Sequence, residues 1–302
     1  MDNRSSAVAV LGNVNLDVVC KTVDDVPRYD SIVYEQGISL PGGCGSNVAI
    51  GLAKQGVDTL LLARTGDDFI ANLLFKTWDQ VGVDARKVQR DSSLPTGTSV
   101  ILVDSAAQPR FVHTLGANAS LRVGTEEIHF LLKKQVKYLH VAGYFVLPGL
   151  LNDQFGEFLG SVRDQGISVS LDVVFTPAMD QPGPLWACLP HLDLFLCNLQ
   201  EARRLTGEEE MDRAVEVLRD KGARNVVIKM GRKGCWAAGE EGERRVPAPV
   251  IIKAEVDTTG AGDAFAAGLL ASLLRGEDLV ESCRQGNRVG AEVVQHLGAV
   301  EV

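Results

Sequence analysis

The sequence predicts an α/β fold with a doubly wound, mostly parallel central sheet, helices on both faces and a small β-sheet lid. Apolar runs of strand length alternate with longer segments of helical period, which is the pattern of β-α-β units. Two segments, about 18–40 and 97–115, break this alternation, have the pattern of hairpins and are expected to form the lid. We expect one domain over 1–302, with central strands at 7–12, 59–63, 138–141, 168–173, 192–197, 225–229 and 235–238.

Composition and charge exclude several classes of protein. The 302 residues are 45% hydrophobic, which is enough for a large core. The net charge of −9 argues against nucleic acid or an anionic membrane surface as the main partner. No signal peptide and no apolar run long enough to span a membrane is found, so we expect a cytoplasmic protein. Six scattered cysteines lack a metal-binding spacing and are expected to be reduced thiols.

The segment 257–263, with the sequence Asp-Thr-Thr-Gly-Ala-Gly-Asp before an apolar helix, is the strongest chemical signal. Gly260, Ala261 and Gly262 leave backbone N–H groups uncovered at a helix N-terminus, where phosphate oxygens can bind. Asp263 follows in the position of a general base. Phosphoryl transfer needs positioning, charge stabilisation and one proton acceptor, and this segment can supply them. The structural alternative is a tight strand-to-helix turn.

Two further segments have the residues of an acceptor site. Asn15 and Asp17 follow the first strand and can bind sugar hydroxyls from one face of an extended segment, although an Asx turn gives the same pattern. Gly42, Gly43 and Asn47 lie at a glycine-rich helix start that permits close approach of a ligand. This stretch matches neither a dinucleotide-binding fingerprint nor a P-loop. A flexible loop with Asn47 as a helix cap is the structural alternative.

Two more segments carry groups suited to a nucleotide. Asn198 and Glu201 open a helix with the spacing of a capping box, but the same groups can face Mg²⁺ bound to a triphosphate through water. Lys229 ends the next strand and can reach a phosphate. A turn or a solvated edge accounts equally for Gly231 and Gly234 beyond it.

Taken in order, the five segments resemble the ribokinase-like (PfkB) family of carbohydrate kinases over nearly the whole chain. Residues 257–263 and their helix resemble the C-terminal signature of that family, and 42–47 with 65–68 resemble the N-terminal one. The resemblance implies an ATP-dependent kinase that phosphorylates a hydroxymethyl group of a small sugar or sugar-like molecule. It makes Asp263 the general base and the backbone of Gly260, Ala261 and Gly262 the anion hole.

The same resemblance assigns residues to subsites. The acceptor-binding residues would be Asn15, Asp17, Gly42, Gly43 and Asn47. The nucleotide-binding residues would be Asn198, Glu201, Lys229, Gly231, Gly234 and Asn287, with Glu201 also holding Mg²⁺ through water. A monovalent cation such as K⁺ would be ligated by Asp257 and Thr259. Where ribokinases have a serine that helps to hold potassium, however, this chain has Glu301-Val302.

The identity of the acceptor stays open at this point. Ribokinases have a lysine where this chain has Cys44, so ribose is not assured. Arg110 in the second hairpin can bind a carboxylate or phosphate of the substrate, or lie exposed on the lid. Nucleoside kinases share the motifs, so a nucleoside is the alternative acceptor, with Tyr144 or Phe145 stacking on its base. The lid edges could also pair in a homodimer.

Two other classes of protein are disfavoured. A non-catalytic sensor is expected to lose the base or the anion turn, and this chain keeps Asp263 and the three small residues before it. A nicotinamide-dependent oxidoreductase needs glycines in the first strand-to-helix turn, where this chain has Asn15.

Overall fold

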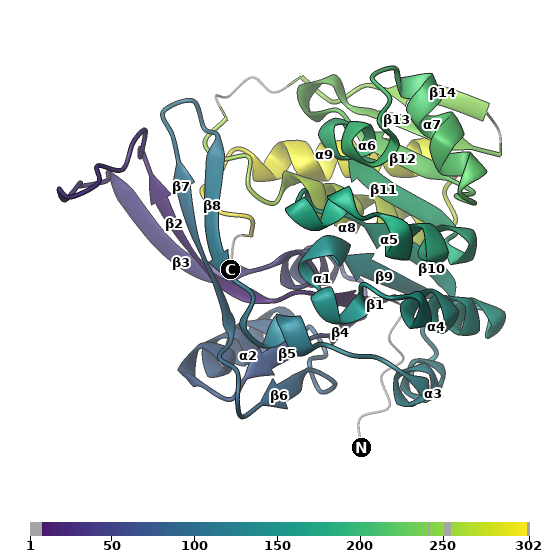
Figure 1. The fold of residues 1–302 in the computed structure, drawn as a ribbon, viewed down its shortest axis with the longest axis horizontal. Coiled ribbons are helices and arrows are strands. Elements are labelled where there is room, and N and C mark those ends of the chain that lie inside the picture. The colour runs from purple at the N-terminus through teal and green to yellow at the C-terminus, as the bar shows by residue number, and fades with distance from the viewer. Residues whose placement is uncertain (1–7, 241, 251–254, 301–302) are drawn as a thin grey trace.

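The structure, a computed structural model, describes residues 8–240, 242–250 and 255–300. These residues form a central sheet in the order β14-β13-β12-β11-β10-β9-β1-β4 (Figure 1). Its strands are parallel except for β13 and β14, which are antiparallel at one edge. The bounds are β1 Val8–Gly12, β4 Thr59–Leu62, β9 Tyr138–Ala142, β10 Ser168–Asp172, β11 Leu194–Asn198, β12 Val226–Lys229, β13 Cys235–Gly239 and β14 Gly242–Val246.

The seven strands predicted for this sheet are confirmed, with ends that differ by two residues at most. Ala7, the predicted start of the first strand, lies outside the described residues. The edge strand β14 was not predicted, because four of its five residues are exposed and it has no apolar run. A second unpredicted pair, β5 Arg64–Gly66 with β6 Gln89–Asp91, forms a short two-stranded sheet.

Helices cover both faces of the central sheet, as the alternation predicts. Strand side chains alternate between two hydrophobic cores, so that Ala9 and Leu11 face one core while Val8 and Val10 face the other. Against the first core pack α3 Thr125–Lys133, α4 Asp153–Asp164, α5 Gly183–Cys188, α6 Leu199–Thr206 and α7 Met211–Asp220. Against the second pack α1 Cys44–Lys54, α2 Phe69–Val81, α8 Ala261–Leu274 and α9 Leu279–Val293.

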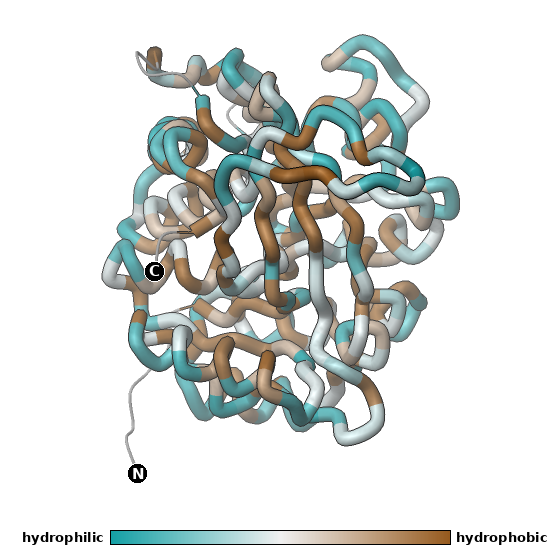
Figure 2. Tube along the Cα trace, turned by 90° about the vertical axis from the view of Figure 1, so that its left-hand side faces the viewer, coloured by the Kyte–Doolittle hydropathy of each residue, from teal (hydrophilic) through white to brown (hydrophobic). Residues whose placement is uncertain are grey.

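A second, four-stranded sheet stands beside this body, at the left of Figure 1, in the order β3-β2-β7-β8. We call it the lid sheet. Strands β2 and β7 pair in parallel and join the two antiparallel pairs, so the two segments predicted as hairpins form one sheet. Figure 2 shows hydrophobic residues concentrated along the strands, with hydrophilic residues mainly at the turns. The bounds are β2 Asn15–Lys21, β3 Gln36–Gly42, β7 Gly97–Val103 and β8 Pro109–Thr114.

The lid sheet differs from the prediction in two details. Strand β2 begins at Asn15, so Asn15 and Asp17 belong to the lid sheet itself and do not merely follow the first strand. Residues 22–35 separate β2 from β3, so these two strands do not form a tight hairpin. None of the described helices has the length and apolar content needed to cross a membrane. The six cysteines are free thiols, as predicted.

Candidate active site

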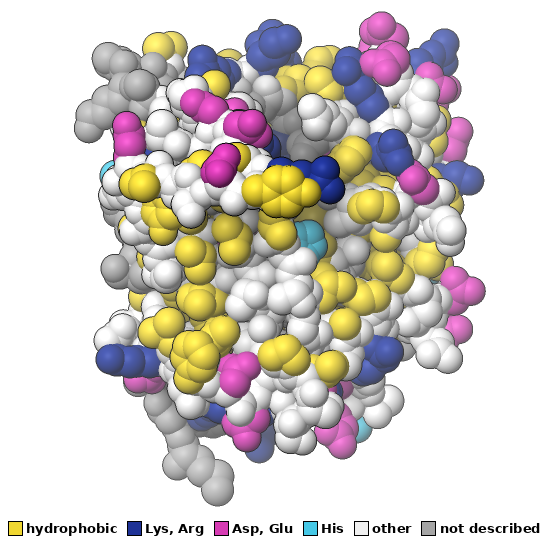
Figure 3. Space-filling view, turned by 60° about the vertical axis from the view of Figure 1, so that its left-hand side comes forward, with side chains coloured by type: hydrophobic (Ala, Val, Ile, Leu, Met, Phe, Trp, Pro, Cys, Tyr) yellow, Lys and Arg dark blue, Asp and Glu magenta, His cyan; other side chains and the backbone are white. Residues whose placement is uncertain are grey.

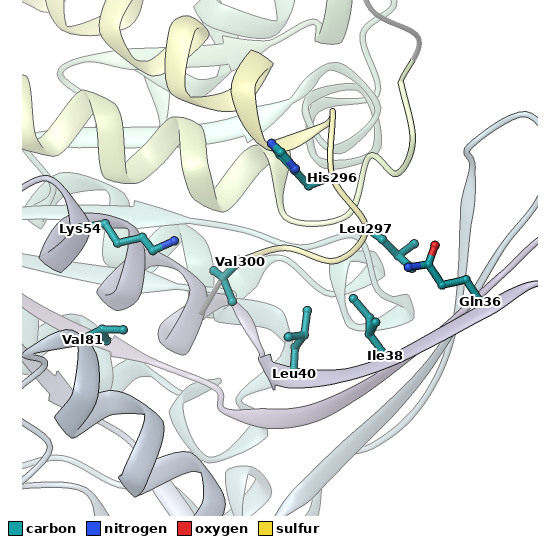
Figure 4. Close-up of a pocket in the computed structure, with 8 residues that line it drawn as sticks. All are labelled: Gln36, Ile38, Leu40, Lys54, Val81, His296, Leu297 and Val300. Carbon is teal, nitrogen blue, oxygen red and sulfur yellow. The ribbon is translucent and has the colours of Figure 1, made fainter.

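A cavity of about 1430 Å³ lies at the carboxyl ends of the parallel strands, and both the central sheet and the lid sheet contribute to its lining. This is the edge at which open α/β sheets bind ligands. A second, more open hollow lies between β3, α1, α2 and the C-terminal segment (Figure 4). Its described lining contains no carboxylate, so we assign the chemistry to the first cavity. The residues that line the second hollow are Gln36, Ile38, Leu40, Lys54, Val81, His296, Leu297 and Val300.

The turn that starts α8 has the predicted form. Gly260 is the N-cap residue with φ 74°, a left-handed conformation that favours glycine. A Cβ at this position would also lie 2.2 Å from the Cβ of Ala299. Helix α8 begins at Ala261, so Gly262 and Asp263 lie in its first turn, where backbone N–H groups have no intrahelical acceptor. Together with the helix dipole, this turn is a site for an anion.

Asp263 faces the start of α1 across the cavity. Its Oδ2 accepts a hydrogen bond from Asn47 Nδ2 at 2.8 Å, and the thiol of Cys44 lies beside the same carboxylate. Burial raises the pKa of Asp263, whereas the bonds from Asn47 and Cys44 and the charge of Lys229 hold it back. The result is a carboxylate of increased basicity, as a general base needs.

Asn15 and Asp17 point to the same face of β2, two residues apart, as predicted. Asn15 Nδ2 donates to Ser99 Oγ at 3.2 Å, and its Oδ1 accepts from Asn118 Nδ2 at 3.0 Å. Asp17 is buried, and its Oδ1 has no hydrogen-bond donor in the described residues. Burial raises the pKa of Asp17 to about 7; a bond from Ser99 lowers it, and the charge of Asp263 adds to the increase. A hydroxyl donor from a ligand would satisfy the free oxygen.

The two glycines before α1 have different roles. Gly43 lines the cavity and has φ 83°. Gly42 was predicted to bind the acceptor, but it is not among the residues that line the cavity. A Cβ on Gly42 would lie 1.9 Å from Cγ of Asp17, so this glycine makes room for that carboxylate. Its part in the site is therefore indirect.

Asp172, Asn198 and Lys229 are the last residues of three neighbouring parallel strands, β10, β11 and β12. Lys229 Nζ donates to Asp172 Oδ2 at 2.5 Å, while Asp172 Oδ1 is buried without a partner among the described residues. Burial raises the pKa of Asp172, and the ammonium of Lys229 limits the increase to about 6. Burial alone would lower the pKa of Lys229. The negative charges of Asp172 and Glu201 outweigh this effect, so the pKa is raised.

Asn198 and Glu201 form the capping box that their spacing predicts. Asn198 Oδ1 accepts from the Glu201 N–H at 2.9 Å, and Glu201 Oε2 accepts from the Asn198 N–H at 2.6 Å. Both residues also line the cavity, so the structural interpretation and the functional one are compatible. Burial raises the pKa of Glu201 to about 7, against the opposing charge of Lys229.

These oxygen groups fit Mg²⁺ held mainly by phosphates and water. Glu201 and the unpartnered Oδ1 of Asp172 are hard oxygen groups in the lining of the cavity, of the kind that Mg²⁺ prefers. Within the described residues, no group of three or more His, Cys, Asp and Glu side chains makes a metal site of its own. That is consistent with a metal that arrives with its phosphates.

The remaining nucleotide-side residues shape the wall of the cavity. Gly231, with φ 57°, lines it, as do Gly234 and Asn287. A Cβ on Gly234 would lie 2.1 Å from the carbonyl oxygen of Val246, so this glycine is required by the turn itself. Asn287 Nδ2 donates to the carbonyls of Val246 and Pro247 at 3.1 and 3.3 Å, and so anchors the chain after β14 at the rim of the cavity.

Three residues considered for ligand contacts do not line the cavity, and Arg110 has the exposed lid position that was its alternative. Arg110 is exposed and donates to the carbonyls of Val23 and Asp24, and it is not among the residues that line the cavity. Tyr144 and Phe145 are 0% and 4% exposed and pack in the core, so they cannot stack on a base. An aromatic pair after a strand has the same pattern in a core as at a binding site.

The residues predicted to bind a monovalent cation have a different arrangement. Asp257 Oδ1 accepts from the N–H and Oγ1 of Thr259 at 2.9 and 2.6 Å, and its Oδ2 accepts from the Gly298 N–H at 2.9 Å. Asp257 is 0% exposed. Both carboxylate oxygens thus accept from protein donors, and the monovalent-cation site at Asp257 and Thr259 stays a prediction. Glu301 and Val302 lie outside the described residues.

Comparison with known proteins identifies the family. The model of the family described as "pfkB family carbohydrate kinase" matches residues 5–302. The chain belongs to this family. An uncharacterized sugar kinase of Archaeoglobus fulgidus is 30% identical over 83% of this chain and 97% of its own length. An Arabidopsis thaliana ribokinase is 28% identical over 99% of this chain and 79% of its own length.

Solved structures agree with this assignment. The ribokinase of Thermotoga maritima has 26% sequence identity and a TM-score of 0.79, with 97% of this chain and 94% of that chain covered. The chain is therefore a pfkB carbohydrate kinase with the ribokinase-like fold, and its family is one of ATP-dependent kinases. The predicted fold class and enzyme class are confirmed.

The cavity of this pfkB kinase contains two notable residues that sequence reasoning did not place in the site. Asp172 ends a predicted strand, and an acidic residue at the carboxyl end of a parallel strand is the signal that would have found it. Cys44 was noted only as a departure from ribokinases, yet its thiol touches Asp263. That contact needs α1 and α8 to pack together, which the sequence does not reveal.

Proposed function

We propose that this sugar kinase transfers the terminal phosphoryl group of ATP to a hydroxymethyl group of a small sugar or sugar-like molecule. The observation that carries the proposal is the position of Asp263. Its carboxylate lies in the first turn of α8, bonded to Asn47 at 2.8 Å, in a cavity that is also lined by Asp17 of the lid sheet and Glu201 of α6. The base thus stands between an acceptor side and a nucleotide side.

In the proposed reaction Asp263 accepts the proton of the acceptor hydroxyl while the oxygen attacks the terminal phosphorus of ATP, the bond from that phosphorus to the bridging oxygen breaks, and ADP leaves with the bond's electron pair. The first-turn N–H groups of α8 stabilise the negative charge that develops on the phosphoryl oxygens. Mg²⁺, when bound, neutralises phosphate charge, and Glu201 and Asp172 would hold it through water. Asn47 keeps Asp263 oriented and ionised, since its amide donates to the charged form.

The ammonium of Lys229 also stabilises the negative charge on the phosphoryl oxygens. A Cβ on Gly262 would lie 3.2 Å from Lys229 Nζ, so the ammonium lies against the anion turn. Asp172 fixes the ammonium at 2.5 Å and, with burial, limits its movement. We infer that Lys229 contributes positive charge to the phosphoryl group while Asp172 positions it.

The identity of the acceptor is not fixed by the relatives, because they are named ribokinase, fructokinase and 2-dehydro-3-deoxygluconokinase. A nucleoside kinase of the same family is the second candidate. It is supported by Phe111 and His113 of β8, which line the cavity from the lid and offer flat surfaces to a base.

The test is a coupled ADP-release screen with ATP, Mg²⁺ and a panel of pentoses, hexoses, sugar acids, inositols and nucleosides. With the best acceptor, we expect Asp263→Ala to lower kcat by about 10²–10⁴-fold, while ATP affinity stays nearly unchanged. Asp278→Ala is the matched control, because Asp278 is likewise an acidic residue at a helix start, that of α9, but does not line the cavity. Near-normal turnover of Asp263→Ala would contradict the proposal.

We also propose that the kinase forms a homodimer through the lid sheet. Strands β3 and β8 are the edges of this sheet, and exposed edges can pair with a second chain. Val100 and Val112 are 40% and 65% exposed, and Figure 3 shows hydrophobic side chains spread over this side of the molecule. Light scattering during size-exclusion chromatography tests this, and a monomer at micromolar concentration would rule it out.

A further inference from the structure

The charge of the cavity beside the lid indicates which class of acceptor the kinase takes; this inference rests on the proposed function. We define the acceptor end as the part of the lining that comes from the lid strands and the start of α1, together with Asp263. Its polar members are Asn15, Asp17, Cys44, Asn47, Ser99, His113 and Asp263.

Two carboxyl groups, Asp17 and Asp263, face this end. Asp17 Oδ1 is buried and has no donor among the described residues, and Asn47 Oδ1 is in the same state. Both oxygens can accept a hydrogen bond from a hydroxyl, but neither can from a carboxylate or an ionised phosphate. The acceptor end thus has unsatisfied acceptor atoms and two acidic side chains.

In the part of the chain that the structure describes, the cations beside this end that could balance an anionic acceptor are paired with other groups. Arg110 donates to main-chain carbonyls of the lid. Lys229 is paired with Asp172 at 2.5 Å, and Arg232 with Glu255 at 2.7 Å on the nucleotide side. Among the described residues that the lid strands and α1 contribute to the lining, His113 is the only basic side chain.

We propose that the acceptor is electrically neutral: a polyhydroxylated sugar or a nucleoside, and not a sugar acid or a sugar phosphate. Its hydroxyls donate to Asp17, to Asn47 Oδ1 and, at the reacting oxygen, to Asp263. Above the pKa of Asp17, which burial raises to about 7, an anionic group at this end meets the repulsion of two carboxylates in a partly desolvated space. At short range each such charge costs roughly ten- to a hundredfold in binding.

The experiment uses matched pairs that differ in charge: ribose with ribonate, glucose with gluconate, and fructose with fructose 6-phosphate. ADP release and ligand-induced shifts of the melting temperature are measured for each member at pH 8, above the pKa of about 7 to which burial raises Asp17. In at least one pair we expect turnover and a shift with the neutral member, and kcat/KM at least about a hundredfold lower with the anion. Equal or better turnover of an anion overturns the inference and leaves the proposed function standing.

Measuring ligand binding separately from ADP release distinguishes the inference about charge from the proposed function. A neutral sugar that binds without any ADP release contradicts the proposed function and supports the inference about charge. An anion that shifts the melting temperature as much as its neutral partner, or a lack of binding by every neutral ligand, overturns the inference.

A variant tests the cause. Asp17→Asn removes one of the two charges, so the ratio of kcat/KM between neutral and anionic members should fall by roughly tenfold, whatever happens to the absolute rate. Asp30→Asn is the control, because Asp30 is an exposed lid carboxylate outside the cavity lining, and its ratio should equal that of the parent. An unchanged ratio in Asp17→Asn overturns the electrostatic reason.

Discussion

Replacing Asn47 by leucine tests the role of Asp263 without removing the base. Burial raises the pKa of Asp263, and the amide of Asn47, which donates to its Oδ2 at 2.8 Å, opposes that increase. A hydrogen bond to a charged group contributes about 1.5–3 kcal/mol. Since one pKa unit corresponds to about 1.4 kcal/mol, loss of this bond should raise the pKa of Asp263 by roughly 1–2 units.

The assay is kcat as a function of pH with saturating ATP, Mg²⁺ and acceptor. Only ionised Asp263 can accept the hydroxyl proton, so kcat falls on the acidic side as the carboxylate is protonated. In Asn47→Leu the acidic limb should move up by roughly 1–2 pH units, with much of the alkaline plateau retained. Saturation with acceptor separates this shift from weaker binding, because Asn47 Oδ1 is also free to accept from the substrate.

Asn225→Leu is the matched control. Its amide Nδ2 donates to the Asp193 carbonyl at 2.8 Å. Asn225 directly precedes β12, so it lies at the opposite end of that strand from Lys229. The same chemical change at Asn225 should leave the acidic limb of the kcat–pH profile where it is in the parent enzyme. If Asn47→Leu lowers kcat equally at every pH and its limb does not move, the reasoning is refuted and the contact serves geometry alone.

Four further predictions follow from the buried charges. Lys229→Met leaves Asp172 without its cation and should lower the free energy of unfolding, measured with urea, by about 3–5 kcal/mol, while adding Asp172→Leu should restore stability but not turnover. Glu201→Gln keeps the cap and removes the charge, so the Mg²⁺ concentration for half-maximal rate should rise; an unchanged value would exclude Glu201 from the metal site. Gly42→Ala directs a Cβ at Asp17 and should raise KM for the acceptor but not for ATP. Burial raises the pKa of Asp17 and Glu201 to about 7 and of Asp172 to about 6, from usual values of 3.8 and 4.5. The folded state therefore binds more protons than the unfolded one from pH ~4 to 7, and stability falls as pH rises through this window, so calorimetry should give a higher Tm at pH 5.5 than at pH 8.

The sequence was sufficient for the fold because the alternation of apolar strands and amphipathic helices reflects the two cores directly. It was also sufficient for Asn198 and Lys229 at strand ends, since carboxyl ends of parallel strands meet at one edge, but it missed Asp172 at the end of β10. The sequence was not sufficient where the type of a residue does not determine its role. Tyr144 and Phe145 have the pattern of a binding site but pack in a core, and the guanidinium of Arg110 binds main-chain carbonyls of its own lid. Neither outcome can be predicted without knowing the tertiary neighbours.

The connection between the lid sheet and α1 explains why the acceptor side and the base belong together. Strand β3 runs into α1 with only Gly43 between them, and β2, which carries Asp17, pairs with β3 along its length. Asn47, which holds Asp263, is therefore on the same stretch of chain as the lid strand that makes room for Asp17. The nucleotide side is built separately, from β11, β12 and the turn before β13. An acceptor that binds Asp17 thus acts on the element that orients the base, whereas ATP does not, so changes in the lid sheet should alter kcat and acceptor KM together and leave ATP affinity unaltered.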